Sequence, residues 1–270
     1  MVNSIQSAPS TLPLKQASAA LDQSLNRISS GQRINSAADD AAGLAISETF
    51  SAQSRGQNQA IRNAGDGISQ TQTASGDLNS LIEGTQRIRE LAVQSANGSY
   101  SDADRELINK EVSSIKDQMN SVLEQSNFNG KPLFRGDSDS VYQIGPDSGD
   151  TLVVAANNLQ DKAAQAGLAD VSVGTAEDAQ NTIKLADALL DQFSETAADL
   201  GAVQNRFESR IDSLSQQTLD SEASRSRIED ADLAKESTNR AQNQVQEQVA
   251  IAVQAQANQS AGNVLKLLGS

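Results

Sequence analysis

Residues 179–214 have the sequence AQNTIKLADALLDQFSETAADLGAVQNRFESRIDSL, which carries the strongest apolar periodicity of the chain. Its apolar residues recur at alternating spacings of three and four, which is the rhythm of a coiled-coil seam. The seam runs through Ala179, Ile183, Ala186, Leu190, Phe193, Ala197, Leu200, Gln204, Phe207, Ile211 and Leu214, and only Gln204 interrupts it with a polar side chain. A helix this long needs partners to cover its apolar stripe, so the pattern predicts a bundle of long helices.

Two upstream segments repeat this rhythm. The first is helical from Ala41 to about Ser95 and ends at Asn97-Gly98-Ser99; the second begins at a cap formed by Ser101 and Asp104. The first seam contains Leu78, Leu81, Thr85, Ile88 and Ala92, and the second contains Ile108, Val112, Ile115, Met119 and Val122. Because the connection is short, we expect the two helices to be antiparallel.

The segment that follows changes character. Val141 and Gln143 precede the turn-rich run 145–149, and Leu152, Val153 and Val154 come after it. Apolar and polar residues alternating around a Gly- and Pro-containing turn predict a β-hairpin near residues 140–156. The expected class is therefore mainly α, with long antiparallel coiled-coil helices in a bundle and one β-hairpin.

The two ends of the chain predict weakly apolar helices. The first helix ends near Ser30, and Ser36 with Asp39 and Asp40 supplies a cap and first-turn acids for the next one. The apolar positions of the terminal helices are Leu14, Leu21, Leu25, Ile28, Val253, Val264, Leu267 and Leu268. We expect these helices to pair, and because they bury little apolar area they should become fully ordered only when neighbouring subunits cover them.

Composition excludes several functions. The net charge of −14 disfavours nucleic acid and anionic membranes, and no apolar run is long enough to span a bilayer. The chain has no His and no Cys, which removes the usual general base, nucleophile dyads and zinc ligands. Asp137 and Asp139 lack EF-hand spacing, and Gly65-Asp66-Gly67 follows no strand, so no metal, cofactor or catalytic residue is predicted. The first thirty residues also lack the pattern of a cleaved secretory signal.

Several long motifs resemble the bacterial flagellin family, in that family's order. Residues 27–46 (RISSGQRINSAADDAAGLAI), which include Arg33, Asn35, Asp39 and Asp40, resemble its N-terminal block. Residues 86–98 (QRIRELAVQSANG) and 128–130 (FNG) resemble later motifs. At the C-terminal end, residues 200–207 contain Gln204, Asn205 and Arg206, and residues 223–232 contain Arg227, Asp230 and Asp232. The resemblance covers nearly the whole chain.

The resemblance implies a secreted subunit that polymerises into the extracellular flagellar filament for swimming. It implies that residues 1–43 and 233–270 form an inner coiled-coil layer and that residues 44–232 form the surrounding helical layer. Only about residues 156–175 stand where many flagellins carry variable outer domains, so a short form is expected. Implied partners are further copies of the chain, the type III export apparatus of the flagellum, an export chaperone, the filament cap and the hook–filament junction proteins.

The resemblance also implies contact residues. Arg87, Leu91 and Glu111 match positions that Toll-like receptor 5 contacts in some flagellins, and the same positions serve subunit packing in the filament. Two other functions remain open at this stage, a junction protein between hook and filament and a surface adhesin that binds polysaccharide. A junction protein should form no long filaments alone, and an adhesin should carry an exposed ligand domain.

Overall fold

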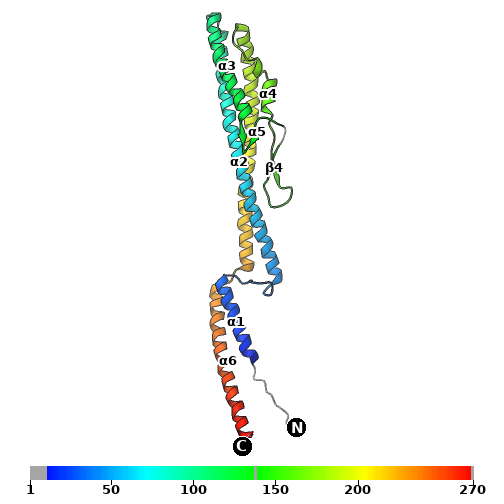
Figure 1. Ribbon diagram of the computed structural model, residues 1–270, viewed down its shortest axis with the longest axis vertical. Helices are drawn as coiled ribbons and strands as arrows, with labels where there is room; N and C mark the ends of the chain where they lie inside the picture. Colours follow the sequence, from blue (N-terminus) through cyan, green and yellow to red (C-terminus); the bar gives the residue numbers. More distant parts are fainter. Residues whose placement is uncertain (1–10, 137–138, 269–270) are drawn as a thin grey trace. The chain divides into compact units, whose positions relative to one another are not determined.

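The computed structural model describes residues 11–136 and 139–268, except for the side chains of residues 11, 261 and 264–268 (Figure 1). The predicted class is confirmed: the chain is mainly helical, with a hairpin of two four-residue strands, β3 and β4, and a shorter pairing of β1 with β2. The helices are α1 Thr11–Ser30, α2 Ala41–Ala96, α3 Asp102–Gln125, α4 Leu159–Gln165, α5 Ala176–Glu229 and α6 Leu233–Leu268, with a 3-10 turn, η1, at Leu168–Asp170. The strands are β1 Asn127–Phe128, β2 Lys131–Pro132, β3 Ser140–Gln143 and β4 Thr151–Val154.

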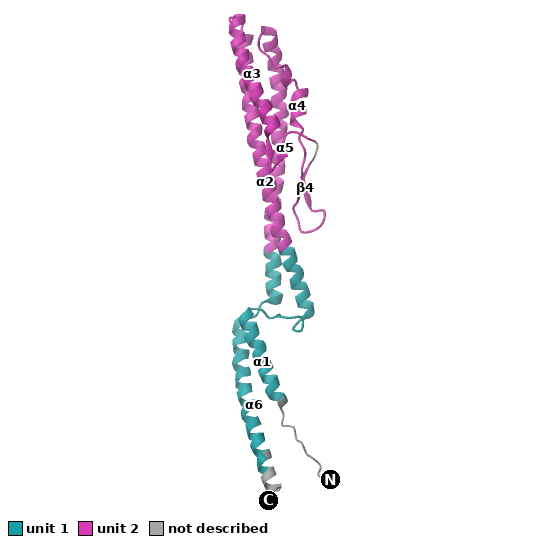
Figure 2. Cartoon of the chain, in the orientation of Figure 1, with its two compact units in different colours: residues 1–54, 219–270 teal, residues 55–218 magenta. Residues whose placement is uncertain are grey.

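The chain divides into two compact units (Figure 2). The first unit joins residues 1–54 with residues 219–270, and the second contains residues 55–218. The first unit is larger than the expected terminal layer, because it includes the beginning of α2 and the end of α5. The functional division at 43/44 and 232/233 stays a prediction.

The core of the second unit is formed by the predicted seams. Leu78, Leu81 and Ile88 of α2 are fully buried, as are Val112 of α3 and Phe193 of α5. Phe134 and the segment from α4 to residue 173 pack against the same core. Small and medium side chains fill most of it, which agrees with a chain that has no Trp. The seam rhythm therefore identified the buried faces of α2 and α3 and most of that of α5, where Leu189 is fully buried and the predicted Leu190 is half-buried.

The α2–α3 connection was also predicted correctly. Ser101 caps α3 through a reciprocal capping box with Asp104, whose side chain accepts from the Ser101 main-chain and hydroxyl donors. These hydrogen bonds, first that of the Ser101 side chain, lower the pKa of Asp104 below its ordinary value. Arg105, only 5% exposed, donates from Nη2 to Asn97 O at 2.9 Å and Tyr100 O at 3.3 Å. The arginine thus satisfies main-chain carbonyls at the C-terminal end of α2.

The hairpin β3–β4 pairs antiparallel with Val141 opposite Val153 and Tyr142 opposite Leu152. Leu152 and Val154 point into a second small core that contains Phe207 of α5. The rings of Tyr142 and Phe207 meet edge to face, with centroids 5.6 Å apart. The hairpin was expected, whereas α4 and η1 were not, because the seven-residue α4 is too short to show a helical period.

Candidate assembly surface

The terminal helices α1 and α6 pack side by side, as predicted. Few of their side chains are buried: Ala17 is 8% exposed, Ser24 is 5% exposed and Glu236 is 8% exposed. Two of these three are polar. The predicted apolar residues Leu14, Leu21 and Ile28 are only half-buried, and Leu25 is 41% exposed. The pair therefore gains little from apolar burial.

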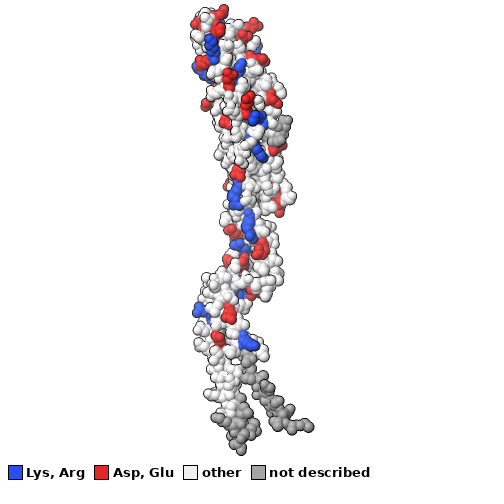
Figure 3. Space-filling model, in the orientation of Figure 1, with Lys and Arg blue, Asp and Glu red and all other residues white. Residues whose placement is uncertain are grey.

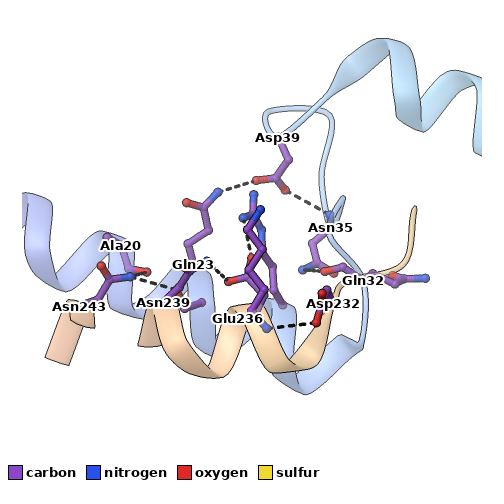
Figure 4. Close-up of polar contacts among 12 residues, drawn as sticks. Ala20, Gln23, Gln32, Asn35, Asp39, Asp232, Glu236, Asn239 and Asn243 are labelled. Atoms are coloured by element: carbon purple, nitrogen blue, oxygen red, sulfur yellow. Dashed lines mark hydrogen bonds and ion pairs between the residues drawn. The ribbon is translucent and has the colours of Figure 1, made fainter. Parts of the chain in front are cut away.

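Polar contacts hold α6 against α1 (Figure 4). The side-chain amide of Asn243 donates to Ala20 O and to Ser24 Oγ, both at 3.1 Å. Arg27 Nη1 donates to Glu236 Oε1 at 3.4 Å, and Asn239 donates to the other oxygen of that carboxylate at 3.3 Å. Buried polar groups of this kind cost stability but have partners in only one register.

The two connections of the first unit lie antiparallel to each other. Gln32 pairs with Asp230 in a β-bridge; Arg33 N donates to Glu229 O at 2.6 Å and Ala231 N donates to Gly31 O at 2.9 Å. The guanidinium of Arg33 also donates to Ile228 O at 2.6 Å. Gly31 has a φ of +70°, a left-handed conformation that favours glycine. The matched N-terminal motif therefore crosses the matched C-terminal motif here.

Asp39 organises the connection between α1 and α2. Its Oδ1 accepts from the Gln23 side chain of α1 at 3.0 Å, and its Oδ2 accepts from Asn35 N, Ser36 N and Ser36 Oγ at 3.0–3.2 Å (Figure 4). The pKa of Asp39 is lowered, first by the Gln23 hydrogen bond and then by that of the Ser36 side chain. The carboxylate ties the loop to α1.

The cap of α2 differs from the expectation. Asp40, not Ser36, caps the helix, since Asp40 Oδ1 accepts from Gly43 N at 2.8 Å. Ser36 instead donates to Asp39 within the loop. A side chain at position 43 would collide, because its Cβ would lie 2.5 Å from Asp40 Oδ2 and 2.7 Å from Ile34 Cδ1. Glycine at this position lets the loop fold back onto the first turn of α2.

The C-terminal motif residues of the first unit also form hydrogen bonds with residues close to them in the sequence. Asp232 caps α6, since its Oδ1 accepts from Ala234 N at 3.0 Å and Lys235 N at 3.1 Å. Asp230 accepts from Ser226 Oγ, and Arg227 donates to Ser224 Oγ at 3.0 Å. Gln204, Asn205 and Arg206 lie in the second unit on α5, where Gln204 donates to Glu208 at 2.9 Å. The two C-terminal motifs are therefore not one site.

An apolar stripe on α6 is left uncovered by the residues that the structure describes. Val245 is 58% exposed, Val249 55% and Val253 59%, and these residues share one helix face at spacings of four. They border a groove against Pro13, Ala17 and Ala20 of α1. Residues 248–265 contain no charged residue, and Figure 3 shows a mostly uncharged surface over the described part of this helix. The predicted residues Val264, Leu267 and Leu268 lie outside the described side chains.

Arg87 and Glu111 form an exposed ion pair between α2 and α3. Arg87 Nη2 lies 2.7 Å from Glu111 Oε1, and Arg87 Nη1 lies 3.2 Å from Glu90 Oε2. These carboxylates, Glu111 first, raise the pKa of Arg87. Leu91 differs from the expectation, because its side chain is 2% exposed and packs inside the core. A contact surface here would use Arg87 and Glu111 but not the Leu91 side chain.

The described residues form no group of three or more His, Cys, Asp or Glu that could hold a metal ion. A cavity of about 30 Å³ lies among Gln70, Ala74, Phe134 and Leu200, which is room for about one water molecule. Along the helices that the structure describes, none has the length and hydropathy to cross a bilayer.

Sequence reasoning missed the polar contacts of the terminal pair. Gln23, Glu236 and Asn243 appeared only as polar residues of weakly amphipathic helices. One signal could have found them: Ser24, Glu236 and Asn243 stand where a seam normally carries apolar residues, and buried polar residues at such positions set register.

Comparisons with known proteins agree with this geometry. Residues 2–139 match the bacterial flagellin N-terminal helical region, and residues 183–268 match the bacterial flagellin C-terminal helical region. The flagellin of Halalkalibacterium halodurans is 38% identical over 247 residues, which cover 91% of each chain. The flagellin of Bacillus subtilis is 36% identical over 293 residues, which cover 94% of this chain and 95% of that protein.

Two solved structures share the fold. Bacillus cereus flagellin superposes with a TM-score of 0.52 at 24% identity, covering 57% of this chain and 88% of that one. A putative flagellar hook-associated protein from Vibrio parahaemolyticus superposes with a TM-score of 0.60 at 16% identity, covering 70% of this chain and 99% of that one.

Proposed function

This chain belongs to the bacterial flagellin family, and from that premise we propose that it is exported unfolded and that its terminal helices order fully only on assembly. It is a structural subunit of the flagellar filament, the extracellular part of the flagellum, and not an enzyme. With 270 residues it is a short form. The proposal concerns how this subunit reaches the filament and joins it.

The observation that carries the proposal is the uncovered apolar stripe Val245, Val249 and Val253. More than half of each side chain is exposed, although each lies on a helix that already packs against α1. Complete burial of such a side chain is worth about 1.5–3 kcal/mol, so covering the exposed part of each contributes roughly 1 kcal/mol. Ordering the chain costs about 1–2 kcal/mol per residue, which makes the isolated pair marginal. Another copy of the chain would supply the missing cover.

A truncation tests this role of the terminal helices. Removal of residues 233–270 takes away α6 with its stripe but leaves the core of the second unit intact. We expect a soluble, largely helical monomer that does not polymerise when seeded with filament fragments. The double variant Val249→Ser with Val253→Ser is the finer test, since it keeps the helix and removes only apolar surface. Normal filament growth by either variant would contradict the proposal.

The same features support the proposed export. A segment with no charge between residues 248 and 265 and with exposed valines is a suitable target for an export chaperone, which would keep it from assembling early. We propose passage through the type III apparatus of the flagellum, folding beneath the filament cap, and contact with hook–filament junction proteins. Binding of a peptide of residues 233–270 to the chaperone of the source organism tests the first step; equal binding by a peptide with Val249 and Val253 replaced by Ser would argue against apolar recognition.

Recognition by Toll-like receptor 5 is a separate proposal. Arg87 and Glu111 present a charged pair on the outside of α2 and α3, with side chains 52% and 48% exposed. We expect Arg87→Ala and Glu111→Ala to lower the response of receptor-expressing cells to the monomer. Arg89→Ala is the matched control, because Arg89 forms a similar exposed ion pair with Asp187 at 2.7 Å. A response that falls equally with all three variants would indicate a general loss of charge rather than a specific contact.

Two other functions, a junction protein between hook and filament and a surface adhesin, have less support. Flagellins at 36% and 38% identity cover more than nine-tenths of the chain, whereas the hook-associated structure is similar in fold at 16% identity. A junction protein would remain monomeric under seeded conditions in which this chain forms long filaments.

A further inference from the structure

The sequence contains two Asn-Gly pairs, Asn97-Gly98 and Asn129-Gly130. An asparagine side chain can be attacked at its amide carbon by the main-chain nitrogen of the next residue. Glycine makes this attack easiest because it has no Cβ to shield the nitrogen or to restrict the main chain. The structure places the two pairs in different surroundings, so their reactivities can be compared within one chain.

Asn97 lies directly after α2, and its side chain is held in a closed ring. Ser99 N donates to Asn97 Oδ1 at 3.1 Å, so the ring closed by this hydrogen bond contains the Gly98 nitrogen. The donor is directed at the oxygen on which negative charge develops when the amide carbon is attacked. A fixed N–H at such an oxygen stabilises the transition state. Both Asn97 and Gly98 are exposed, so water can reach the site.

Asn129 lies in a tight turn between two paired strands. It has a φ of +50° and Gly130 has a φ of +80°, which makes them the central residues of a two-residue turn between β1 and β2. Pairing of Phe128 with Lys131 and of Asn127 with Pro132 holds both sides of this turn. Within residues 11–136 and 139–268, no donor reaches the side-chain oxygen of Asn129. Ring closure there must distort a paired turn without help from an N–H.

We propose that Asn97 is a site of spontaneous deamidation in the folded subunit. The Gly98 nitrogen forms a bond to Asn97 Cγ, its proton goes to the departing amino group, and ammonia leaves, so that a five-membered cyclic imide remains. Water then opens the imide at either carbonyl and yields an aspartyl or an isoaspartyl residue. The net reaction consumes one water and releases one ammonia, with no oxidant or reductant. Subunits in an extracellular filament are not resynthesised in place, so the modification accumulates with age.

The modification changes the α2–α3 turn. Both products place a negative charge at the C-terminal end of α2, where the helix dipole is unfavourable to it. In the isoaspartyl product the main chain runs through Cβ and Cγ and is one methylene longer, and the former main-chain carbonyl of Asn97, whose oxygen accepts from Arg105 Nη2 at 2.9 Å, becomes the free carboxylate. Arg105 is 5% exposed, and its Nη1 has no partner among the described residues, so displacement of this oxygen from the turn would leave a buried charge poorly satisfied.

The test is incubation of the purified full-length chain at neutral pH, followed by tryptic digestion and mass spectrometry. Trypsin releases Asn97 within residues 90–105 and Asn129 within a separate peptide, so both sites are measured in one sample. We expect Asn97 to deamidate about tenfold faster than Asn129 in the folded chain, the factor that roughly 1.4 kcal/mol of transition-state stabilisation gives. In denaturant the two rates should become similar, because both pairs are Asn-Gly.

Gly98→Ala is the matched variant. Gly98 does not have a positive φ, and a Cβ there would meet no atom within 4 Å, so alanine fits without strain. This variant should keep the far-UV circular dichroism spectrum and lose most of the deamidation at Asn97. Equal rates at Asn97 and Asn129 in the folded chain would overturn the proposal. A tenfold difference that persists in denaturant would also overturn it, because the fold would then play no part.

Discussion

The side-chain amide of Asn243 on α6 donates to Ser24 Oγ on α1 at 3.1 Å, and Ser24 is 5% exposed. A polar pair, with Ser24 buried and Asn243 half-buried, thus occupies a place in the terminal helix pair where an apolar seam would be more stable. Such a pair has its hydrogen bonds only when the helices are in one register. We interpret the terminal pair as an interface selected for register at some cost in stability.

Asn243→Ala should destabilise the α1–α6 pair by about 1 kcal/mol, because it removes the donor to Ser24 and to Ala20 O. Urea denaturation followed by far-UV circular dichroism measures the change in the early part of the transition. Gln248→Ala, at an exposed position of the same helix, is the control and should have no measurable effect. Equal effects of the two substitutions would mean that helix propensity, not the hydrogen bond, is being measured.

Gly67→Ala should destabilise the second unit by about 1–3 kcal/mol. A Cβ at this position would lie 2.4 Å from Phe207 Cζ, so the ring would have to leave its contact with Tyr142. Gly65→Ala on the same helix meets no atom within 4 Å and should be neutral or stabilising by up to about 1 kcal/mol. Thermal unfolding of the two variants checks this. The account of Phe207 would be wrong if Gly67→Ala behaved like Gly65→Ala.

Acid should weaken the attachment of the loop 31–40 to α1. The pKa of Asp39 is lowered from its ordinary 3.8, so folding favours the charged form. The stabilisation is therefore complete above 3.8 and is lost as the pH falls through the lower folded value. Asp39→Asn should remove this part of the pH dependence in the acid range below the ordinary pKa of 3.8, measured as unfolding free energy against pH. An identical pH profile for wild type and variant would show that the Asp39 contacts contribute nothing.

The valine stripe predicts a specific assembly defect. Val249→Ser with Val253→Ser should slow seeded filament growth strongly and leave the monomer's thermal unfolding nearly unchanged, since both side chains are already more than half exposed. Val141→Ser is the control, because Val141 is 61% exposed on the hairpin and belongs to the second unit, whereas the stripe belongs to the first. Light scattering after seeding measures growth. A defect of the same size in Val141→Ser would indicate a general effect of surface polarity.

Much of the fold could be predicted from the sequence because long helices repeat one signal many times. The seam through Phe193, Phe207 and Leu214 repeats over several turns, and all three side chains are fully buried. The capping box at Ser101 and Asp104 could also be predicted, because its two residues are three apart and so form a local sequence pattern. Short elements lack such repetition, which is why α4 and the exact cap of α2 at Asp40 were not predicted.

The candidate surface was predicted only in part. Residue types identified the terminal helices, but the bonds from Gln23 to Asp39 and from Asn243 to Ser24 join residues far apart in the chain, and no local pattern encodes them. Leu91 is the opposite case, in which a local pattern did indicate the place of the side chain. Its motif implied a contact residue, whereas the three- and four-residue spacing that links it to Leu78, Leu81 and Ile88 on α2 was already evidence for a core position.

The most direct test of the central claim is far-UV circular dichroism of the full chain before and after seeded polymerisation, with filaments counted by negative-stain microscopy. We expect long filaments and a gain in helical signal on assembly, because the terminal helices become covered and fully ordered. Filaments that form with no gain in helical signal would contradict ordering on assembly, and a chain that stays monomeric with intact seeds would contradict its role as a self-sufficient filament subunit.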